Sequence, residues 1–271
     1  MMSQNEKPKT AKPRSKAPPK PKPHTDEPSN ADGSMRLNRF IADTGQGSRR
    51  DADDLIEAGR VTVNGTVAVI GATVVEGDDV RIDGETVRPP KKKKGRQHVY
   101  IVLNKPVGIT CTTESDVKGN IVDFVGHERR IFPIGRLDKD SEGLILLTSN
   151  GDIVNEILRA ENRHEKEYLV AVNNPVTDDF LRRMARGGLR IHGQETLPCK
   201  AGRLGKFGFR IVLTQGLNRQ IRLMASQFGY RVKQLVRVRI DNVKLGKLKP
   251  GQWRNLTDAE LRGLIPGRAD W

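Results

Sequence analysis

The chain of 271 residues carries 48 Lys and Arg against 33 Asp and Glu, a formal net charge of +15. This length accommodates about two domains, and so large a positive excess favours nucleic acid as the partner over an anionic membrane surface. The longest apolar runs, VYIVL and LILL, are far shorter than the roughly 20 residues of a membrane helix, and no secretory signal is evident. We therefore expect a cytoplasmic protein without membrane association.

Residues 1–34 consist largely of Pro, Lys and small polar residues, with few side chains that a core could bury. Such a composition predicts a disordered cationic tail. Two roles fit the tail equally well from sequence: a tether for RNA and an inert solubilising segment.

Residues 35–88 are predicted to form a small α+β module. The apolar residues in MRLNRFIADTG and RRDADDLIEAG recur at helical spacing, and Ser48 is a suitable N-cap for the second helix. Asn64-Gly65 and Asp83-Gly84 each separate two stretches of alternating apolar residues, which is typical of tight hairpins. Residues 89–97, PPKKKKGRQ, follow as a basic linker that either is simply solvated or contacts phosphates.

Residues 98–271 are predicted to form a second, larger domain of intermixed strands and helices. Strands are expected within HVYIVLNKPVG, at LILLT and KEYLVAV, and within FGFRIVLTQG, and short helices at DIVNEILRA, after Thr177, within NRQIRLMASQFG and after Thr257. Because strands and helices do not alternate regularly, we expect a mixed, largely antiparallel sheet with flanking helices.

Several common chemistries are not supported by motifs. The chain has no GxGxxG or GxxxxGK[ST] phosphate loop and no GxSxG nucleophile motif. Cys111 and Cys199 lie far apart without CxxC spacing, and the five His residues form no cluster with them. We therefore expect no metal and no cofactor.

Three polar residues remain at the boundaries of predicted elements. Asp138 precedes the apolar run LILL, Tyr168 lies within the strand KEYLV, and Arg222 lies on a helix whose neighbouring residues are apolar. An Arg near a core face usually needs a carboxylate partner, and Asp138 is a candidate partner for Arg222. By spacing alone, an ordinary loop role for Asp138 fits better than a catalytic one.

The segments around these residues resemble the motifs of the RNA pseudouridine synthases. GRLDKDSEGLILLT contains Asp138, KEYLV contains Tyr168, QGLNRQIRLM contains Arg222, and NKPVG at 104–108 resembles the first motif of the family. Residues 35–88 resemble the S4 RNA-binding domain that precedes the catalytic domain in the RsuA/RluB/RluE/RluF branch. Within that branch the segments are most similar to the enzymes of large-subunit ribosomal RNA.

The resemblance implies isomerisation of uridine to pseudouridine in ribosomal RNA, with the target base flipped out of its stack. It assigns the catalytic carboxylate to Asp138, its orientation through a bidentate bond to Arg222, and contact with the target base to Tyr168, which is also a candidate general base. Asp140 is interpreted as loop structure. The alternatives are a non-catalytic S4-type ribosome-assembly factor and a synthase of small-subunit RNA or tRNA.

The same resemblance implies a monomer that binds structured RNA without a metal or cofactor. Its expected RNA contacts lie near the catalytic residues and on the exposed faces of the two S4-like helices, where phosphates are the expected ligands. These residues are Arg136, Lys139, Lys105, Asn218 and Arg219 in the catalytic domain, and Arg36, Arg39, Arg49 and Arg50 in the S4-like domain.

Overall fold

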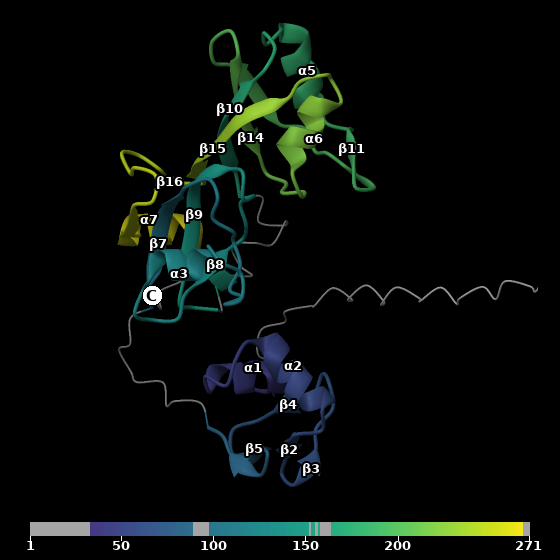
Figure 1. Ribbon diagram of the computed structural model, residues 1–271, viewed down its shortest axis with the longest axis vertical. Coiled ribbons are helices and arrows are strands. Elements are labelled where there is room, and N and C mark those ends of the chain that lie inside the picture. The colour runs from purple at the N-terminus through teal and green to yellow at the C-terminus, as the bar shows by residue number, and fades with distance from the viewer. Residues whose placement is uncertain (1–32, 89–97, 152, 155–156, 158–163, 268–271) are drawn as a thin grey trace, which may run out of the picture. The chain divides into compact units, whose positions relative to one another are not determined.

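The computed structural model describes residues 33–88, 98–151, 153–154, 157 and 164–267 (Figure 1). The chain divides into two compact units, Met1–Pro90 and Lys91–Trp271, and each unit is considered separately below. The predicted cationic tail, apart from residues 33–34, and the predicted basic linker lie outside the described residues, as does most of the helix predicted at DIVNEILRA.

The first unit begins with two helices whose ends follow from the local sequence. The side chain of Ser48 accepts a hydrogen bond from the backbone N–H of Asp51, and the Asp51 carboxylate accepts one from the backbone N–H of Ser48. This reciprocal pair satisfies two backbone donors that would otherwise lack partners at the helix start. The elements are β1 (Met35–Arg36), α1 (Leu37–Asp43) and α2 (Arg49–Glu57).

Short strands complete the first unit and confirm both predicted hairpins. Asn64-Gly65 and Asp83-Gly84 all have positive φ, as a two-residue hairpin turn requires. The helices and strands bury one apolar cluster that includes Leu37, Ile41 and Val61. In the described residues, β3, β2, β5 and β6 form a four-stranded sheet in that order, while β4 pairs with β1. The strands are β2 (Val61–Val63), β3 (Thr66–Val67), β4 (Thr73–Val74), β5 (Val80–Ile82) and β6 (Glu85–Thr86).

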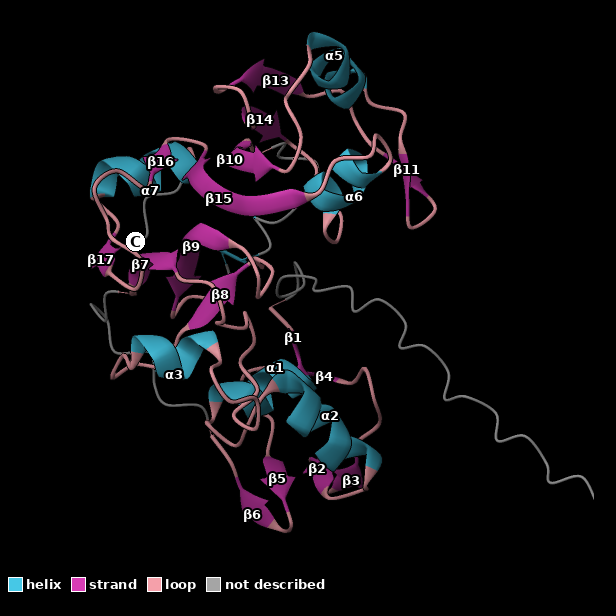
Figure 2. Cartoon of the chain, turned by 45° about the horizontal axis from the view of Figure 1, so that its top comes forward, coloured by secondary structure: helices cyan, strands magenta, loops and turns pink. Residues whose placement is uncertain are grey.

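The second unit is built on a mixed sheet that is nine-stranded in the described part of the chain. The strand order is β13-β14-β10-β15-β9-β7-β17, with β16 on β15 and β8 on β9 (Figure 2). The pairing is antiparallel apart from β9 with β15, which confirms the predicted fold class. The strands are β7 (Tyr100–Lys105), β8 (Phe132–Ile134), β9 (Glu142–Thr148), β10 (Lys166–Val172), β13 (Lys200–Arg203), β14 (Gly208–Leu213), β15 (Val232–Ile240), β16 (Val243–Lys244) and β17 (Trp253–Asn255).

Short helices and one small hairpin flank this sheet. Thr177 caps α5 and Thr257 caps α7 as predicted, the latter in a capping box with Glu260. These elements are α3 (Ile121–Val125), α5 (Asp178–Arg186), β11 (Arg190–Ile191), β12 (Gln194–Glu195), α6 (Gln220–Ser226) and α7 (Asp258–Leu264).

The parallel contact between β9 and β15 is short and unusually close. Its register pairs Val236 with Glu142 and Arg237 with Gly143. A Cβ atom on Gly143 would lie 2.3 Å from the carbonyl oxygen of Arg237, so only glycine permits this approach. The contact joins the strands that follow Asp138 to the strands that carry Tyr168, and it therefore sets the spacing of the predicted catalytic residues.

Candidate active site

The loop between β8 and β9, residues 135–141, carries Asp138, and its backbone is held from beneath. The N–H of Leu137 donates to Cys111 Sγ at 3.4 Å, and the N–H of Gly108 donates to the carbonyl of Lys139 at 2.8 Å. Leu137 itself is buried in the main apolar cluster of the unit. These contacts fix the backbone on both sides of Asp138.

Two arginines from α6 and the residue before it hold the far side of the same loop. Arg219 donates two hydrogen bonds of 2.9 Å, one to each carboxylate oxygen of Asp140. Arg222 Nη2 donates to the carbonyl of Asp140 at 2.9 Å and to Ser141 Oγ at 3.0 Å. The hydrogen bonds from Arg219 hold the pKa of Asp140 below its ordinary value, with the charge of Arg222 contributing further.

The Asp138 carboxylate differs from that of Asp140 in its surroundings. It is 29% exposed, and in the described residues it accepts no hydrogen bond. The cation closest to it is Arg219, whose Nη1 lies 3.8 Å from Asp138 Oδ2. Of the two carboxylates in the loop, Asp140 is thus engaged by arginine while Asp138 is available to a ligand.

The predicted bidentate pair between Arg222 and Asp138 is wrong. Arg222 lies 3.5 Å from the Asp140 carboxylate and otherwise binds backbone and hydroxyl oxygens, including the Val232 carbonyl at 3.3 Å. Asp140 is consequently more than loop structure, because it receives both arginines. Arg219, predicted as an RNA contact, lies closer to Asp138 than its predicted partner does.

Tyr168 lies in the middle of the sheet, in β10. Its backbone pairs with Ile211 on β14 and with Arg237 on β15, and its side chain is 9% exposed. Tyr168 and Leu137 belong to the same apolar cluster, so the strand of Tyr168 and the loop of Asp138 share one core.

Two buried cations beneath the loop were not assigned this place from the sequence. Arg237 is 4% exposed, and its Nε donates to the Leu144 carbonyl at 2.6 Å while Nη1 lies 3.5 Å from the Arg136 carbonyl. Lys105 is fully buried, and its ammonium donates to the Pro106 and Ile109 carbonyls at 2.9 Å each. Burial lowers the pKa of Lys105.

The prediction of Lys105 as an RNA contact is therefore wrong, because no part of its side chain reaches the surface. Its role is to hold the chain after β7, from which Gly108 binds the loop of Asp138. Arg237 and Arg239 alternate in the sequence LVRVRI, but a register shift pairs Arg237 with Tyr168 and Arg239 with the adjacent Glu167, so the two arginines lie on opposite faces of the sheet.

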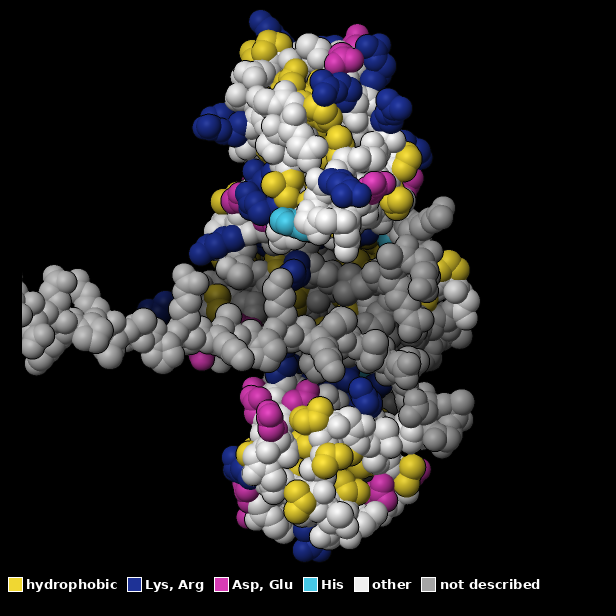
Figure 3. All heavy atoms as spheres, turned by 90° about the vertical axis from the view of Figure 1, so that its right-hand side faces the viewer, with side chains coloured by type: hydrophobic (Ala, Val, Ile, Leu, Met, Phe, Trp, Pro, Cys, Tyr) yellow, Lys and Arg dark blue, Asp and Glu magenta, His cyan; other side chains and the backbone are white. Residues whose placement is uncertain are grey.

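The other predicted RNA contacts of the catalytic unit do reach solvent. Arg136, Lys139, Asn218 and Arg219 are all exposed, on the loop of Asp138 and on the turn before α6. Figure 3 shows further Lys and Arg side chains distributed over the face of this unit that is in view.

The four arginines of the first unit are less uniform than predicted. Arg50 is exposed, whereas Arg36, Arg39 and Arg49 are partly buried. Arg36 donates to the Gly71 carbonyl at 3.0 Å, and Arg39 lies 4.0 Å from Asp43. The prediction that all four are exposed together is thus wrong, although each retains access to solvent.

Taken together, the Asp138 carboxylate, the buried Tyr168 and the arginines near α6 lie around the parallel contact between β9 and β15. No cluster of three or more His, Cys, Asp or Glu suitable for a metal occurs among the described residues. In that part of the chain, no helix is both long enough and apolar enough to span a membrane.

The chain belongs to the RNA pseudouridine synthases. The profile of the RNA pseudouridylate synthase family matches residues 99–227, and that of the S4 domain matches residues 35–80. The chain is accordingly an RNA pseudouridine synthase with an N-terminal S4 domain, an enzyme that isomerises uridine in RNA.

Individual relatives indicate which members of the family this chain resembles. The dual-specificity RNA pseudouridine synthase RluF of Escherichia coli K12 is 54% identical over 234 residues, which is 86% of this chain and 79% of RluF. The ribosomal large subunit pseudouridine synthase B of Bacillus subtilis is 33% identical, covering 84% of this chain and 95% of that protein. A crystal structure of a pseudouridylate synthase superposes with a TM-score of 0.62 at 28% identity, covering 85% of this chain and all of that one.

Proposed function

We propose that Asp138 is the catalytic carboxylate of this synthase and that its substrate is a structured segment of large-subunit ribosomal RNA. The observation that carries the proposal is the contrast within one loop: Asp140 is bound by Arg219, while Asp138 accepts no hydrogen bond from the described residues. A carboxylate kept free of hydrogen bonds retains its lone pairs for the reaction.

The reaction breaks the N1–C1′ bond of the target uridine, turns the base, and joins C5 to C1′. N1 gains a proton and C5 loses one, so the product is an isomer of the substrate and neither oxidant nor transferred group is needed. Asp138 stabilises the positive charge that develops as the N1–C1′ bond breaks, or attacks the nucleotide directly. In either role the carboxylate acts beside Arg219, whose Nη1 lies 3.8 Å from Asp138 Oδ2.

Tyr168 is proposed to contact the detached base and to accept the C5 proton. Its aromatic ring suits packing against uracil, and its hydroxyl makes no hydrogen bond within the described part of the chain. Arg222 is proposed to position the loop of Asp138 through Asp140 and Ser141 rather than through Asp138 itself. Arg136, Lys139 and Asn218 are proposed to contact RNA, as are the exposed groups of the S4 arginines Arg36, Arg39, Arg49 and Arg50.

The proposed RNA target rests on the relatives. The Bacillus subtilis relative is named for the large ribosomal subunit. RluF, which is 54% identical to this chain, is named a dual-specificity RNA pseudouridine synthase. We therefore propose large-subunit ribosomal RNA as the principal substrate and a second RNA as an additional one, with a cytoplasmic monomer acting without metal or cofactor.

A tritium-release assay tests the catalytic assignment. With ribosomal RNA labelled at C5 of uridine, Asp138→Asn should reduce release at least a thousandfold, because the substitution removes the negative charge but leaves the side-chain size unchanged. Asp179→Asn serves as the matched control, because Asp179 is an exposed carboxylate on α5, and this variant should release tritium at the rate of the native chain. Release by Asp138→Asn within tenfold of the control would contradict the assignment.

A further inference from the structure

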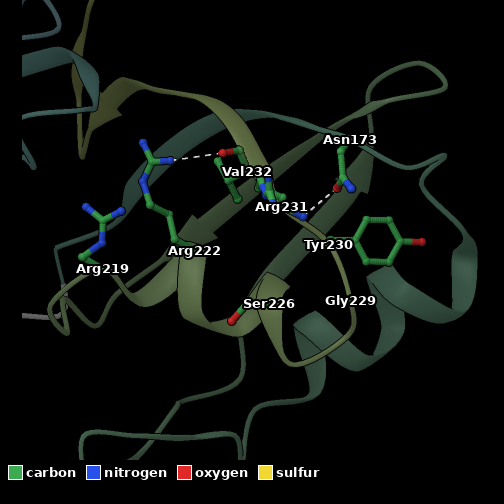
Figure 4. A pocket seen from close by; sticks show the side chains of 8 residues that line it. All are labelled: Asn173, Arg219, Arg222, Ser226, Gly229, Tyr230, Arg231 and Val232. Atoms are coloured by element: carbon green, nitrogen blue, oxygen red, sulfur yellow. Dashed lines mark hydrogen bonds between the residues drawn. The ribbon is translucent and has the colours of Figure 1, made fainter.

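A pocket of about 400 Å³ opens beside the loop of Asp138. It is lined by Arg219, Arg222 and Ser226 from the α6 region, by Tyr230 and Arg231 from the segment leading into β15, and by Asn173 after β10. Figure 4 shows Arg219 and Arg222 on one side, Tyr230 and Asn173 on the other, and Arg231 between them. A volume of this size falls in the range of about 300–1,000 Å³ that holds small ligands.

The side chains lining this pocket are rich in hydrogen-bond donors and include no carboxylate. Three guanidinium groups face it, and Arg219 and Arg222 are already engaged by Asp140 on the loop side. The Arg231 guanidinium is exposed and makes no hydrogen bond or ion pair with the residues that the structure describes. A donor-rich lining with one unengaged cation fits an anion that offers several acceptor oxygens.

Asn173 supports the same interpretation. Its Oδ1 accepts a hydrogen bond of 2.6 Å from the backbone N–H of Arg231, which leaves its Nδ2 as a donor with no acceptor among the described residues. Tyr230 is fixed in place, because its ring stacks on Phe180 at 3.9 Å and its hydroxyl donates to the Pro175 carbonyl. The side chains of Tyr230 and Asn173 are thus fixed at this wall of the pocket, and the Arg231 side chain extends from the backbone segment that Asn173 binds.

We propose that this pocket binds the phosphodiester of a nucleotide next to the target uridine. The proposal rests on the proposed role of Asp138, because Arg219 both lines the pocket and lies 3.8 Å from the Asp138 carboxylate. The neighbouring backbone of an RNA strand whose flipped nucleotide reaches Asp138 lies within reach of this wall, because Arg219 borders both. A phosphate fits the lining better than a base does, because a base also carries donors and these side chains offer few acceptors.

Binding to a stem-loop of large-subunit ribosomal RNA tests the pocket without requiring turnover. Arg231→Ala should weaken binding by about tenfold at 0.15 M salt and reduce the slope of log K against log salt by about one, because one phosphate contact is lost. Arg231→Lys should recover most of the affinity. Asn173→Asp keeps the acceptor for the backbone N–H of Arg231 and adds a negative charge to the pocket. This variant should bind the RNA more weakly than Arg231→Ala does.

Arg262→Ala is the matched control. Arg262 is an exposed arginine on α7 without a partner in the described residues, and Figures 1 and 2 both place α7 away from α6. Its substitution should change the affinity less than twofold. Equal losses for Arg231→Ala and Arg262→Ala would overturn the proposal, because both would then report only the overall charge.

A chemical series on the RNA locates the phosphate. Single uncharged methylphosphonate linkages are placed on either side of the target uridine, and each RNA is bound to the native chain and to Arg231→Ala. At one linkage the two changes should not be additive: Arg231→Ala should cost less than twofold on that RNA and about tenfold on the others. Additive losses at every linkage would refute the pocket. Tritium release by Asp138→Asn at the rate of the native chain would instead refute the proposed role of Asp138 and leave this binding result standing.

Discussion

Asp140→Asn should slow the reaction because it releases Arg219, which can then bind the carboxylate of Asp138. In the native chain Asp140 accepts two hydrogen bonds of 2.9 Å from Arg219, and these keep Arg219 3.8 Å from Asp138. The neutral amide of Asn attracts Arg219 less, so its guanidinium should move the remaining distance and form a charge-assisted hydrogen bond with Asp138. The carboxylate proposed to react would then be occupied.

The size of the effect follows from the exposure of the pair. The side chains of Arg219 and Asp140 are 43% and 48% exposed, so solvent reduces the contribution of their ion pair to folding to about 1 kcal/mol. For a unit of this size that corresponds to a fall in melting temperature of about 2–4 °C. Releasing Asp138 from a new hydrogen bond to Arg219 should cost about 1.5 kcal/mol, which is about tenfold in rate.

Single-turnover pseudouridine formation at saturating RNA measures this rate without interference from binding. Asp140→Asn should be about tenfold slower than the native chain, and the double variant Asp140→Asn/Arg219→Gln should recover most of the rate while binding RNA less tightly. Asp179→Asn is the matched control. If Asp140→Asn reacts within twofold of the native chain, or if the double variant is no faster, Asp140 does not keep Arg219 from Asp138.

Two further predictions concern the framework of the catalytic unit. Gly143→Ala should destabilise folding by about 3 kcal/mol or more and abolish activity, because its Cβ would lie 2.3 Å from the Arg237 carbonyl oxygen. Gly188 also has a positive φ, but no atom lies within 4 Å of a Cβ built on it. In denaturant titrations Gly188→Ala should therefore lower the free energy of unfolding by only about 1 kcal/mol. The hydrogen bonds from Arg254 lower the pKa of Glu260 in the folded state. Glu260→Gln should therefore remove about 1–2 kcal/mol of stability above about pH 4.5. The difference between the native chain and the variant should disappear as the pH falls through the folded-state pKa of Glu260. A stability difference that stays constant from pH 7 to pH 3 would contradict the second prediction, and equal losses for the two glycine variants would contradict the first.

The features that the sequence predicted correctly depend on interactions between near neighbours in the chain. The cap at Ser48 involves a residue three positions away, and the turn at Asn64-Gly65 joins strands only two residues apart. The family motifs likewise identified the loop of Asp138, because they are contiguous. Such features are encoded within a few residues and need no knowledge of the tertiary structure.

The features that were wrong depend on how distant segments meet. Arg219 and Arg222 lie one turn apart, and their partners depend on how α6 packs against the loop. Arg219 adopts a left-handed conformation with φ 52° just before the helix, so its side chain reaches the Asp140 carboxylate first. Lys105 was expected to contact RNA because its motif resembles one of the family, but β7 lies between β9 and β17 and is buried along its whole length. Neither arrangement can be derived from spacing alone.

The short contact between β9 and β15 also divides the proposed catalytic residues into two groups. Asp138 precedes β9 on one side of that contact, whereas Tyr168 and the arginines of α6 lie on the other, and only two residue pairs of parallel ladder connect the strands there. A nucleotide held by both sides acts as an additional cross-link between two halves of one sheet. In the proposed complex the RNA would therefore help to hold the two parts of the site together, and the phosphodiester bound beside Arg231 would contribute to the placement of the reacting base.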